Sequence, residues 1–198
     1  IDNTDFYPSK GKERIKSMIE TRPDWCVSRQ RVWGVPLPIF ISKKTGDVLV
    51  DDEVFENIAK IYEKEGSDCW FNEDYQIFLG DKYKAEDYEK LSDIVEVWFD
   101  SGSTHSFVLE KRDDLKWPAS MYLEGSDQHR GWFHSSLLES CGTRGVAPFE
   151  SILSHGFVVD GKGLKMSKST GNVIAPQDIL KKYGADILRI WVASSNYA

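Results

Sequence analysis

Short apolar stretches alternate with helical patterns in the second half of this chain, and this alternation restricts its fold more than any other feature. Residues 94–99, 120–123 and 152–159 are predicted strands, and a helix is predicted over 131–141, after the second of them. Strands that alternate with helices indicate an α/β layer whose sheet is mostly parallel. In such a sheet, ligands bind beyond the carboxyl ends of the strands.

The other segments add loops and helices around this layer. Residues 1–11 are polar and rich in turn formers, so we expect a loop there, followed by a helix over 12–20. We expect residues 42–93 to form a small inserted subdomain. The remaining predicted elements are a strand at 37–41, an amphipathic helix at 51–65, a hairpin turn at Asp160-Gly161, a helix that begins at Pro176 and a helix over 185–194, with Gly184 between the last two.

The composition excludes several classes of protein. The chain has 198 residues and a formal net charge of −7, which argues against a surface that coats nucleic acid. The isolated cysteines Cys26, Cys69 and Cys141 disfavour a disulfide scaffold and a structural zinc site. No stretch is as apolar as a membrane span, and no signal-peptide pattern opens the chain, so we expect a cytoplasmic protein that does not associate with membranes. Because the first residue is Ile1, we expect a processed chain or a piece of a longer protein.

A loop rich in glycine and lysine carries the strongest local signal. Residues 161–172 read GKGLKMSKSTGN, with three glycines, three lysines and three hydroxyl side chains. Such a loop is flexible, donates many hydrogen bonds and concentrates positive charge, as a site for polyphosphate requires. The spacing is not that of a Walker A loop. The alternative is a solvated basic hairpin without a ligand.

Two further segments place polar or aromatic side chains where predicted strands end. Glu124, Asp127 and Gln128 follow the strand at 120–123, and their carboxylate and amide groups suit hydroxyl and ammonium donors of a ligand. Asp and Gln also cap helices, which is the alternative for this turn. Trp98 lies near the end of the strand at 94–99 and is either a pocket wall or a core residue.

Four segments in this order resemble class I aminoacyl-tRNA synthetases, and within that class the isoleucine enzymes. KMSKS at 165–169 matches the class signature without a substitution. The other segments are PDWCVSRQR at 23–31 with WGVP at 33–36, WFDSG at 98–102, and EGSDQHRGWF at 124–133. The resemblance implies the second half of a Rossmann-like catalytic domain. Residues 1–41 would re-enter the catalytic core, 42–93 would form the inserted α+β subdomain, and 94–198 would complete the half that carries the KMSKS loop.

The resemblance also implies roles for residues of the turn after the strand at 120–123. Glu124, Gly125 and Asp127 would hold the adenylate, chiefly through its ribose. Gln128 would help to bind the amino group of the amino acid.

The resemblance implies further roles for two tryptophans and for residues of the last predicted strand. Trp98 and Trp132 would wall the pocket for the aliphatic side chain. Gly156, Phe157 and Val158 would lie against the adenine. Such an apolar pocket discriminates weakly against a ligand that lacks one methylene group, and the isoleucine enzyme is itself the standard illustration of that rule.

The reaction implied by the resemblance is that of an isoleucine–tRNA ligase. ATP, with Mg²⁺, and L-isoleucine would form isoleucyl-adenylate, and the isoleucyl group would pass to tRNA(Ile). Lys165 and Lys168 would be catalytic and would stabilise charge on the phosphates, Lys168 also binding ATP, while no metal would be bound by the protein itself. The alternative is a non-catalytic module that binds an adenylate or a partner protein. The intact lysines and the intact turn at 124–128 favour the enzyme.

Two expectations concern what this stretch of sequence lacks or leaves open. The second class I signature, a His-x-Gly-His turn, does not occur in these 198 residues, so we expect them to be inactive alone. The segment 25–34 is either a structural anchor or a contact for the acceptor end of tRNA.

Overall fold

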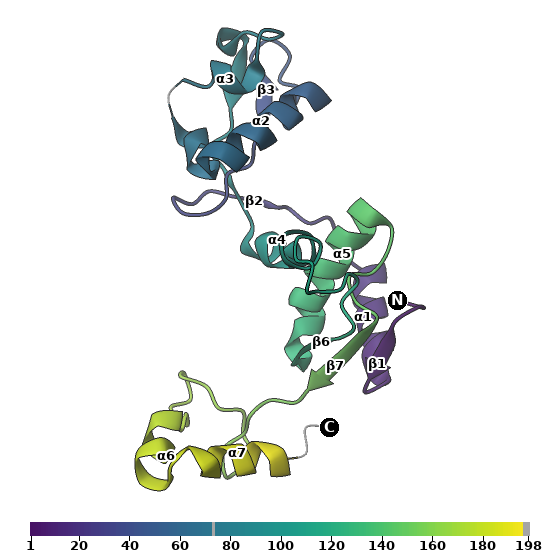
Figure 1. Ribbon diagram of the computed structural model, residues 1–198, viewed down its shortest axis with the longest axis vertical. Helices are drawn as coiled ribbons and strands as arrows, with labels where there is room; N and C mark the ends of the chain where they lie inside the picture. The colour runs from purple at the N-terminus through teal and green to yellow at the C-terminus, as the bar shows by residue number, and fades with distance from the viewer. Residues whose placement is uncertain (73, 196–198) are drawn as a thin grey trace. The chain divides into compact units, whose positions relative to one another are not determined.

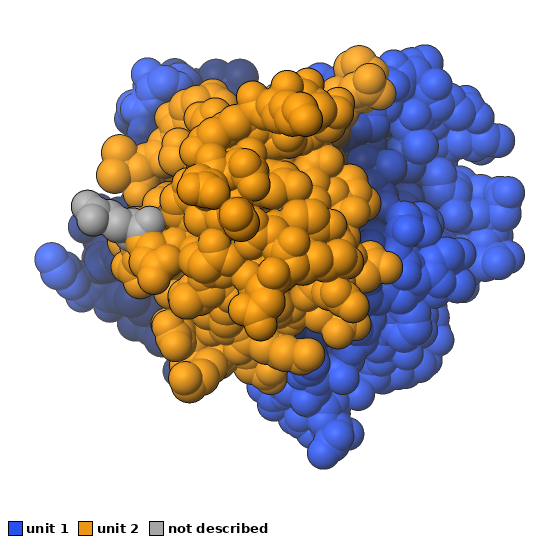
Figure 2. Space-filling view, turned by 90° about the horizontal axis from the view of Figure 1, so that it is seen from above, with its two compact units in different colours: residues 1–22, 102–198 blue, residues 23–101 orange. Residues whose placement is uncertain are grey.

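The computed structural model describes residues 1–72 and 74–195. These residues belong to two compact units, which Figure 2 distinguishes by colour. The sheet unit comprises residues 1–22 and 102–198, and the intervening unit comprises residues 23–101. The inserted subdomain expected at 42–93 lies within the limits of the intervening unit.

A parallel sheet forms the centre of the sheet unit. Its strands are β1 (Asp5–Tyr7), β7 (Ser151–His155) and β6 (Tyr122–Gly125), in the order β1-β7-β6, with both pairings parallel (Figure 1). Ile152 of β7 lies opposite Phe6 on one side and opposite Tyr122 on the other. The parallel sheet with its helices confirms the predicted α/β class.

The predicted loop over 1–11 is wrong, because these residues contain a strand and the start of a helix. β1 pairs with β7, and helix α1 runs from Lys10 to Glu20. Within β1 only Phe6 is buried, so three residues offer too little alternation of apolar and polar side chains to be recognised. The strand forms because a partner about 145 positions later in the chain supplies its hydrogen bonds.

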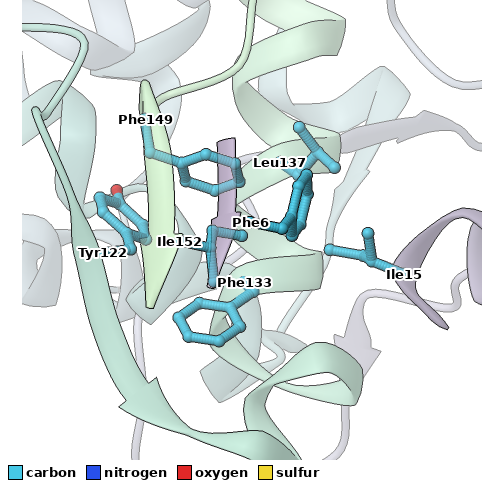
Figure 3. Packing of buried hydrophobic residues seen from close by; sticks show 7 residues of the cluster. All are labelled: Phe6, Ile15, Tyr122, Phe133, Leu137, Phe149 and Ile152. Atoms are coloured by element: carbon cyan, nitrogen blue, oxygen red, sulfur yellow. The ribbon is translucent and has the colours of Figure 1, made fainter. Parts of the chain in front are cut away.

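The core of the sheet unit joins the sheet to α1 and to helix α5 (Trp132–Arg144). Figure 3 shows the buried side chains converging from all five elements and from the segment before β7; they are Phe6, Ile15, Tyr122, Phe133, Leu137, Phe149 and Ile152. Burial of each large apolar side chain contributes roughly 1.5–3 kcal/mol relative to exposure. At the end of α5, Gly145 has a φ of 74°, a left-handed conformation that favours glycine.

The strand predicted over 94–99 is correct only at its start. β5 spans Ile94–Val95 and pairs with β2 (Ser28–Arg29) in an antiparallel manner, so it lies outside the parallel sheet. Helix α4 then runs from Val97 to Gly102. The Glu96 carboxylate accepts a hydrogen bond from the Trp98 backbone N–H at 3.0 Å, which favours helix where the apolar run alone indicated strand.

Strand and helix limits near the candidate site also shift. β6 begins two residues later than predicted and includes Glu124 and Gly125, and β7 ends at His155 rather than at residue 159. The π-helix η3 (His105–Leu109) precedes β6, and the 3-10 helix η4 (Ser126–Arg130) follows it directly. The helix predicted over 131–141 is confirmed as α5.

The intervening unit has a core of its own. β3 (Phe40–Ser42) pairs antiparallel with β4 (Tyr88–Lys90), and α2 (Asp52–Glu65) begins after Asp51, whose side chain accepts hydrogen bonds from the first turn. Short helices complete it: η1 (Ser67–Phe71), α3 (Gln76–Leu79) and η2 (Ala85–Asp87). Aromatic rings fill this core, including Phe40, Trp70 and Phe78, with 5.0 Å between the ring centroids of Trp70 and each of the other two.

The last two helices agree with the sequence prediction. α6 runs from Pro176 to Tyr183 and α7 from Ala185 to Ser194, with Gly184 between them at a φ of 81°. Among the helices that the structure describes, none combines the length and the apolar character needed to span a bilayer.

Candidate functional site

The carboxyl ends of β6 and β7 lie side by side. In their parallel register, Glu124 faces Ser154 and Gly125 faces His155. The loops that follow the two strands therefore start at the same edge of the sheet, where α/β proteins bind ligands. This register brings the predicted turn at 124–128 next to the segment that starts at Gly156.

Gly125 lets the following acidic side chain fold back over the backbone. A Cβ atom at this position would lie 2.6 Å from Asp127 Oδ1, closer than such atoms approach in proteins. Gly125 is itself buried, whereas Glu124 and Asp127 are exposed. Any larger residue at 125 would displace the Asp127 carboxylate from the strand end.

The Gln128 side chain has the capping geometry that the sequence left open as an alternative. Its Oε1 accepts a hydrogen bond from the Trp132 backbone N–H at 2.9 Å, at the start of α5. Its Nε2 donates to Asp127 Oδ2 at 3.1 Å. The Gln128 amide is thus oriented by the helix and by the neighbouring carboxylate. Its predicted role in binding an amino group stays a prediction.

His129 stabilises this turn, a role that the sequence analysis did not identify. Its ring is buried, and Nδ1 donates to the Ser126 carbonyl oxygen at 2.8 Å. Burial lowers the pKa of His129 below its ordinary value, which keeps the ring neutral. A Cβ at Gly11 of α1 would lie 3.0 Å from His129 Nε2, so glycine in α1 makes room for this ring. No periodicity or motif spacing indicated this contact, because it joins α1 to a turn far along the chain.

The two tryptophans predicted to form a pocket wall lie in different units. Trp132 is half-buried at the start of α5, where it packs against the core of the sheet unit. Trp98 lies on α4 in the intervening unit, with 43% of its surface exposed. The pocket itself stays a prediction.

The glycine- and lysine-rich loop begins as a hairpin, as the Asp160-Gly161 turn predicted. Val159 and Lys165 form an antiparallel bridge, and the Asp160 N–H donates to the Leu164 carbonyl oxygen at 2.8 Å. The ammonium of Lys165 lies 3.5 Å from the centroid of the Phe157 ring, a cation–π contact. Phe157, Val158 and Lys168 are exposed.

The segment 25–34 contains partly buried and exposed residues but no fully buried one. Arg29 Nη1 donates to the carbonyl oxygens of Cys26 and Ser28 at 2.7 and 2.8 Å, which fixes the local backbone. By contrast, Trp33 is 90% exposed. Among the residues that the structure describes, no group of three or more His, Cys, Asp or Glu side chains is arranged to hold a metal ion.

Comparisons with known proteins find a family model and relatives that match this chain. A family model described as tRNA synthetases class I (I, L, M and V) matches residues 1–198. The chain is 85% identical to the isoleucine–tRNA ligase of Pelagibacter ubique and 58% identical to that of Zymomonas mobilis, in both cases over 100% of this chain. It covers 22% and 21% of those relatives, so it spans about a fifth of their length.

Solved structures share the fold at low sequence identity. One is the complex of an Agrobacterium radiobacter LeuRS with tRNA and LeuAMS, at a TM-score of 0.59 and 19% identity, over 94% of this chain and 27% of that one. Another is the Mycobacterium tuberculosis methionyl-tRNA synthetase bound by methionyl-adenylate, at a TM-score of 0.55 and 19% identity, over 95% of this chain and 28% of that one.

Proposed function

Because this chain belongs to the class I tRNA synthetases of the isoleucine, leucine, methionine and valine group, we propose that it supplies part of the adenylate-forming site of an isoleucine–tRNA ligase. The 85% identity to an isoleucine–tRNA ligase supports isoleucine over the other three amino acids. The observation that carries the proposal is the parallel register of β6 and β7. Because of this register, the acidic turn at 124–128 and the segment that leads to the lysine loop begin at the same edge of the sheet.

The proposed reaction is an in-line displacement at phosphorus. A carboxylate oxygen of isoleucine attacks the α-phosphorus of ATP, and the bond from that phosphorus to the bridging oxygen breaks. Pyrophosphate leaves with the electron pair, and the mixed anhydride of isoleucine and AMP remains. Such a reaction depends mainly on positioning and on stabilisation of charge. ATP enters as its magnesium complex, so Mg²⁺ arrives with the substrate.

Each residue of the site has a role in this proposal. Lys165 and Lys168 stabilise the negative charge that develops on the departing pyrophosphate. Glu124 and Asp127 are exposed carboxylates that can accept hydrogen bonds from ribose hydroxyls, and Gly125 allows close approach of the backbone.

The amino acid and the base occupy neighbouring positions. The Gln128 amide contacts the amino group of isoleucine, and Trp98 and Trp132 bound its side chain. Gly156, Phe157 and Val158 lie against the adenine. Phe157 also contacts the Lys165 ammonium, so adenine binding at Phe157 would release the lysine for the phosphates.

In the second half of the reaction, a hydroxyl oxygen of the terminal ribose of tRNA(Ile) attacks the carbonyl carbon of the adenylate. The bond from that carbon to the phosphate oxygen breaks, AMP leaves with the electron pair, and the hydroxyl proton is released. The proposal includes a cytoplasmic location, where both ATP and tRNA are present.

A chimeric enzyme tests the proposal. Residues 1–198 replace the matching segment of the Pelagibacter ubique ligase, and isoleucine-dependent exchange between ATP and labelled pyrophosphate is measured. We expect exchange that depends on isoleucine and is lost in Lys168→Ala. A folded chimera without exchange, beside an active parent ligase, would contradict the proposal and favour a non-catalytic module.

A further inference from the structure

The Asp160 carboxylate lies at the centre of a small hydrogen-bond network in the lysine loop. Its Oδ1 accepts from the backbone N–H groups of Lys162 and Leu164, both at 2.9 Å. Its Oδ2 accepts from Asn172 Nδ2 at 2.8 Å. These three donors hold the pKa of Asp160 below its usual range, with the Asn172 amide as the largest cause.

Asn172 extends this network to the signature residues themselves. Its Oδ1 accepts from the Ser167 backbone N–H at 3.0 Å, and its Nδ2 also lies 3.2 Å from the Lys165 carbonyl oxygen. One amide group therefore contacts Asp160, Lys165 and Ser167. The bond between Asp160 and Asn172 closes a ring of the chain that contains the whole KMSKS sequence.

Without such a closure this loop has few constraints on its conformation. It contains Gly161, Gly163 and Gly171, and the last two have φ values of 77° and 71°. Glycine loses more conformational freedom on ordering than any other residue, so fixing this backbone is entropically expensive. The network joins the two turns, 160–164 and 167–171, through hydrogen bonds within the chain itself.

We propose that Asp160 and Asn172 form a clamp that positions Lys165 and Lys168 for the transition state of adenylate formation. The two residues are positioning residues, and the inference rests on the proposed function. Lys168 lies within the second turn, where the Gly171 N–H donates to the carbonyl oxygens of Ser167 and Lys168. Because Asn172 holds Ser167 and Asp160 holds Asn172, the clamp fixes the backbone from which Lys168 projects.

An exchange of the two side chains provides a specific test. In Asp160→Asn, two amide groups face each other, and Asn172 can turn its oxygen toward residue 160 only by losing the Ser167 N–H. In Asn172→Asp, two carboxylates face each other and repel. In the double variant Asp160→Asn/Asn172→Asp, an amide again donates to a carboxylate, and the loop keeps its net charge. The double variant loses the contact with the Lys165 carbonyl oxygen, because residue 172 can no longer donate to it.

The first measurement follows the clamp without reference to activity. Millisecond hydrogen exchange of the 198-residue chain reports on the amides of Lys162, Leu164 and Ser167. We expect faster exchange in both single variants and recovery of protection in the double variant. Equal exchange in all four proteins would overturn the clamp.

The second measurement asks whether the reaction uses the clamp. In the chimera, we expect kcat for isoleucine-dependent pyrophosphate exchange to fall about ten-fold in each single variant, while KM for isoleucine changes less than about two-fold. The double variant should recover to within about three-fold of the wild-type kcat. Asp178→Asn in α6 is the matched control, since it makes the same substitution on an exposed side chain outside the loop.

The outcomes separate the clamp from the function on which it rests. An inactive wild-type chimera overturns the proposed function, and the exchange measurement still decides whether the clamp orders the loop. An active chimera whose double variant is as slow as the product of the two single effects overturns the positioning role. Recovery of both protection and kcat in the double variant supports it.

Discussion

The indole ring of Trp132 lies parallel to the phenol ring of Tyr122, with 4.0 Å between the ring centroids and 2° between the ring planes. Tyr122 is buried in β6, and its hydroxyl forms a hydrogen bond of 3.1 Å with Ser136 Oγ of α5. Burial raises the pKa of Tyr122, so the phenol stays protonated. The stacked pair therefore packs β6, which ends at the candidate site, against α5, which begins after it.

Trp132→Ala should destabilise the sheet unit, because it removes the stack and a half-buried ring. We expect the free energy of unfolding of the chain to fall by about 2–4 kcal/mol, and by less in Trp132→Phe, which keeps an aromatic ring. Urea unfolding measures this loss. In the chimera, the ratio of kcat/KM for isoleucine over valine should fall as well. An unchanged ratio with reduced stability would show that Trp132 is a core residue alone.

Trp98→Ala should distinguish a role in the isoleucine pocket from an effect on stability more clearly than Trp132→Ala does. Because 43% of the Trp98 surface is exposed, its removal should change the unfolding free energy less than that of Trp132. If Trp98 bounds the isoleucine side chain, the ratio of kcat/KM for isoleucine over valine falls in the chimera. A ratio equal to that of the wild type would exclude Trp98 from the pocket.

Lys168→Ala should slow adenylate formation far more than it weakens isoleucine binding. A charge used mainly in the transition state contributes about 3 kcal/mol by analogy with an oxyanion-hole donor, which corresponds to about a hundred-fold in kcat. Pyrophosphate exchange in the chimera measures both kcat and KM for isoleucine. Lys168→Arg keeps the charge and should retain more activity than Lys168→Ala. A kcat that does not change in Lys168→Ala would remove this residue from the catalytic site.

Acidification should weaken the packing of α1 and α5 around two histidines. The pKa values of His129 and His134 are lowered from 6.5, first by burial, with Arg14 facing His129 and Arg22 and Arg130 facing His134. His134 Nε2 lies 3.2 Å from Arg22 Nη1, so the neutral ring accepts a hydrogen bond there. Because both folded pKa values lie below the unfolded value, the unfolded chain binds more protons as the pH falls past 6.5.

The free energy of unfolding should thus be fully maintained above pH 6.5 and should decline as the pH falls toward the folded pKa values. Urea unfolding at several pH values between about 8 and 5 measures the slope. His129→Asn and His134→Gln each keep one hydrogen-bonding atom and do not titrate, so each should flatten the slope. If the slope in both variants equalled that of the wild type, the pH dependence would belong to other groups.

Residues 1–198 alone should form no detectable isoleucyl-adenylate, even with ATP, magnesium and isoleucine in excess. The lysine loop and the turn after β6 supply one wall of the proposed site, and this sequence contains no His-x-Gly-His turn for the other. Pyrophosphate exchange on the purified chain tests this expectation. Activity that disappears in Lys168→Ala would show that these residues suffice.

The sequence by itself determined the features that depend on local signals. α7 has the predicted limits, α6 begins at Pro176 as expected, and Gly184 separates them, because a proline and a glycine mark helix ends through their own backbone preferences. The hairpin turn at Asp160-Gly161 was found for the same reason. The KMSKS motif and the turn at 124–128 could be recognised because their residues are contiguous.

Only the tertiary structure decided the features that depend on distant partners. β1 exists because β7 pairs with it. The clamp between Asp160 and Asn172, the contact of Lys165 with Phe157 and the room that Gly11 makes for His129 are equally invisible in the sequence. For residues other than proline, local propensity contributes at most about 1 kcal/mol per residue, so hydrogen bonds and burial supplied by remote segments override it.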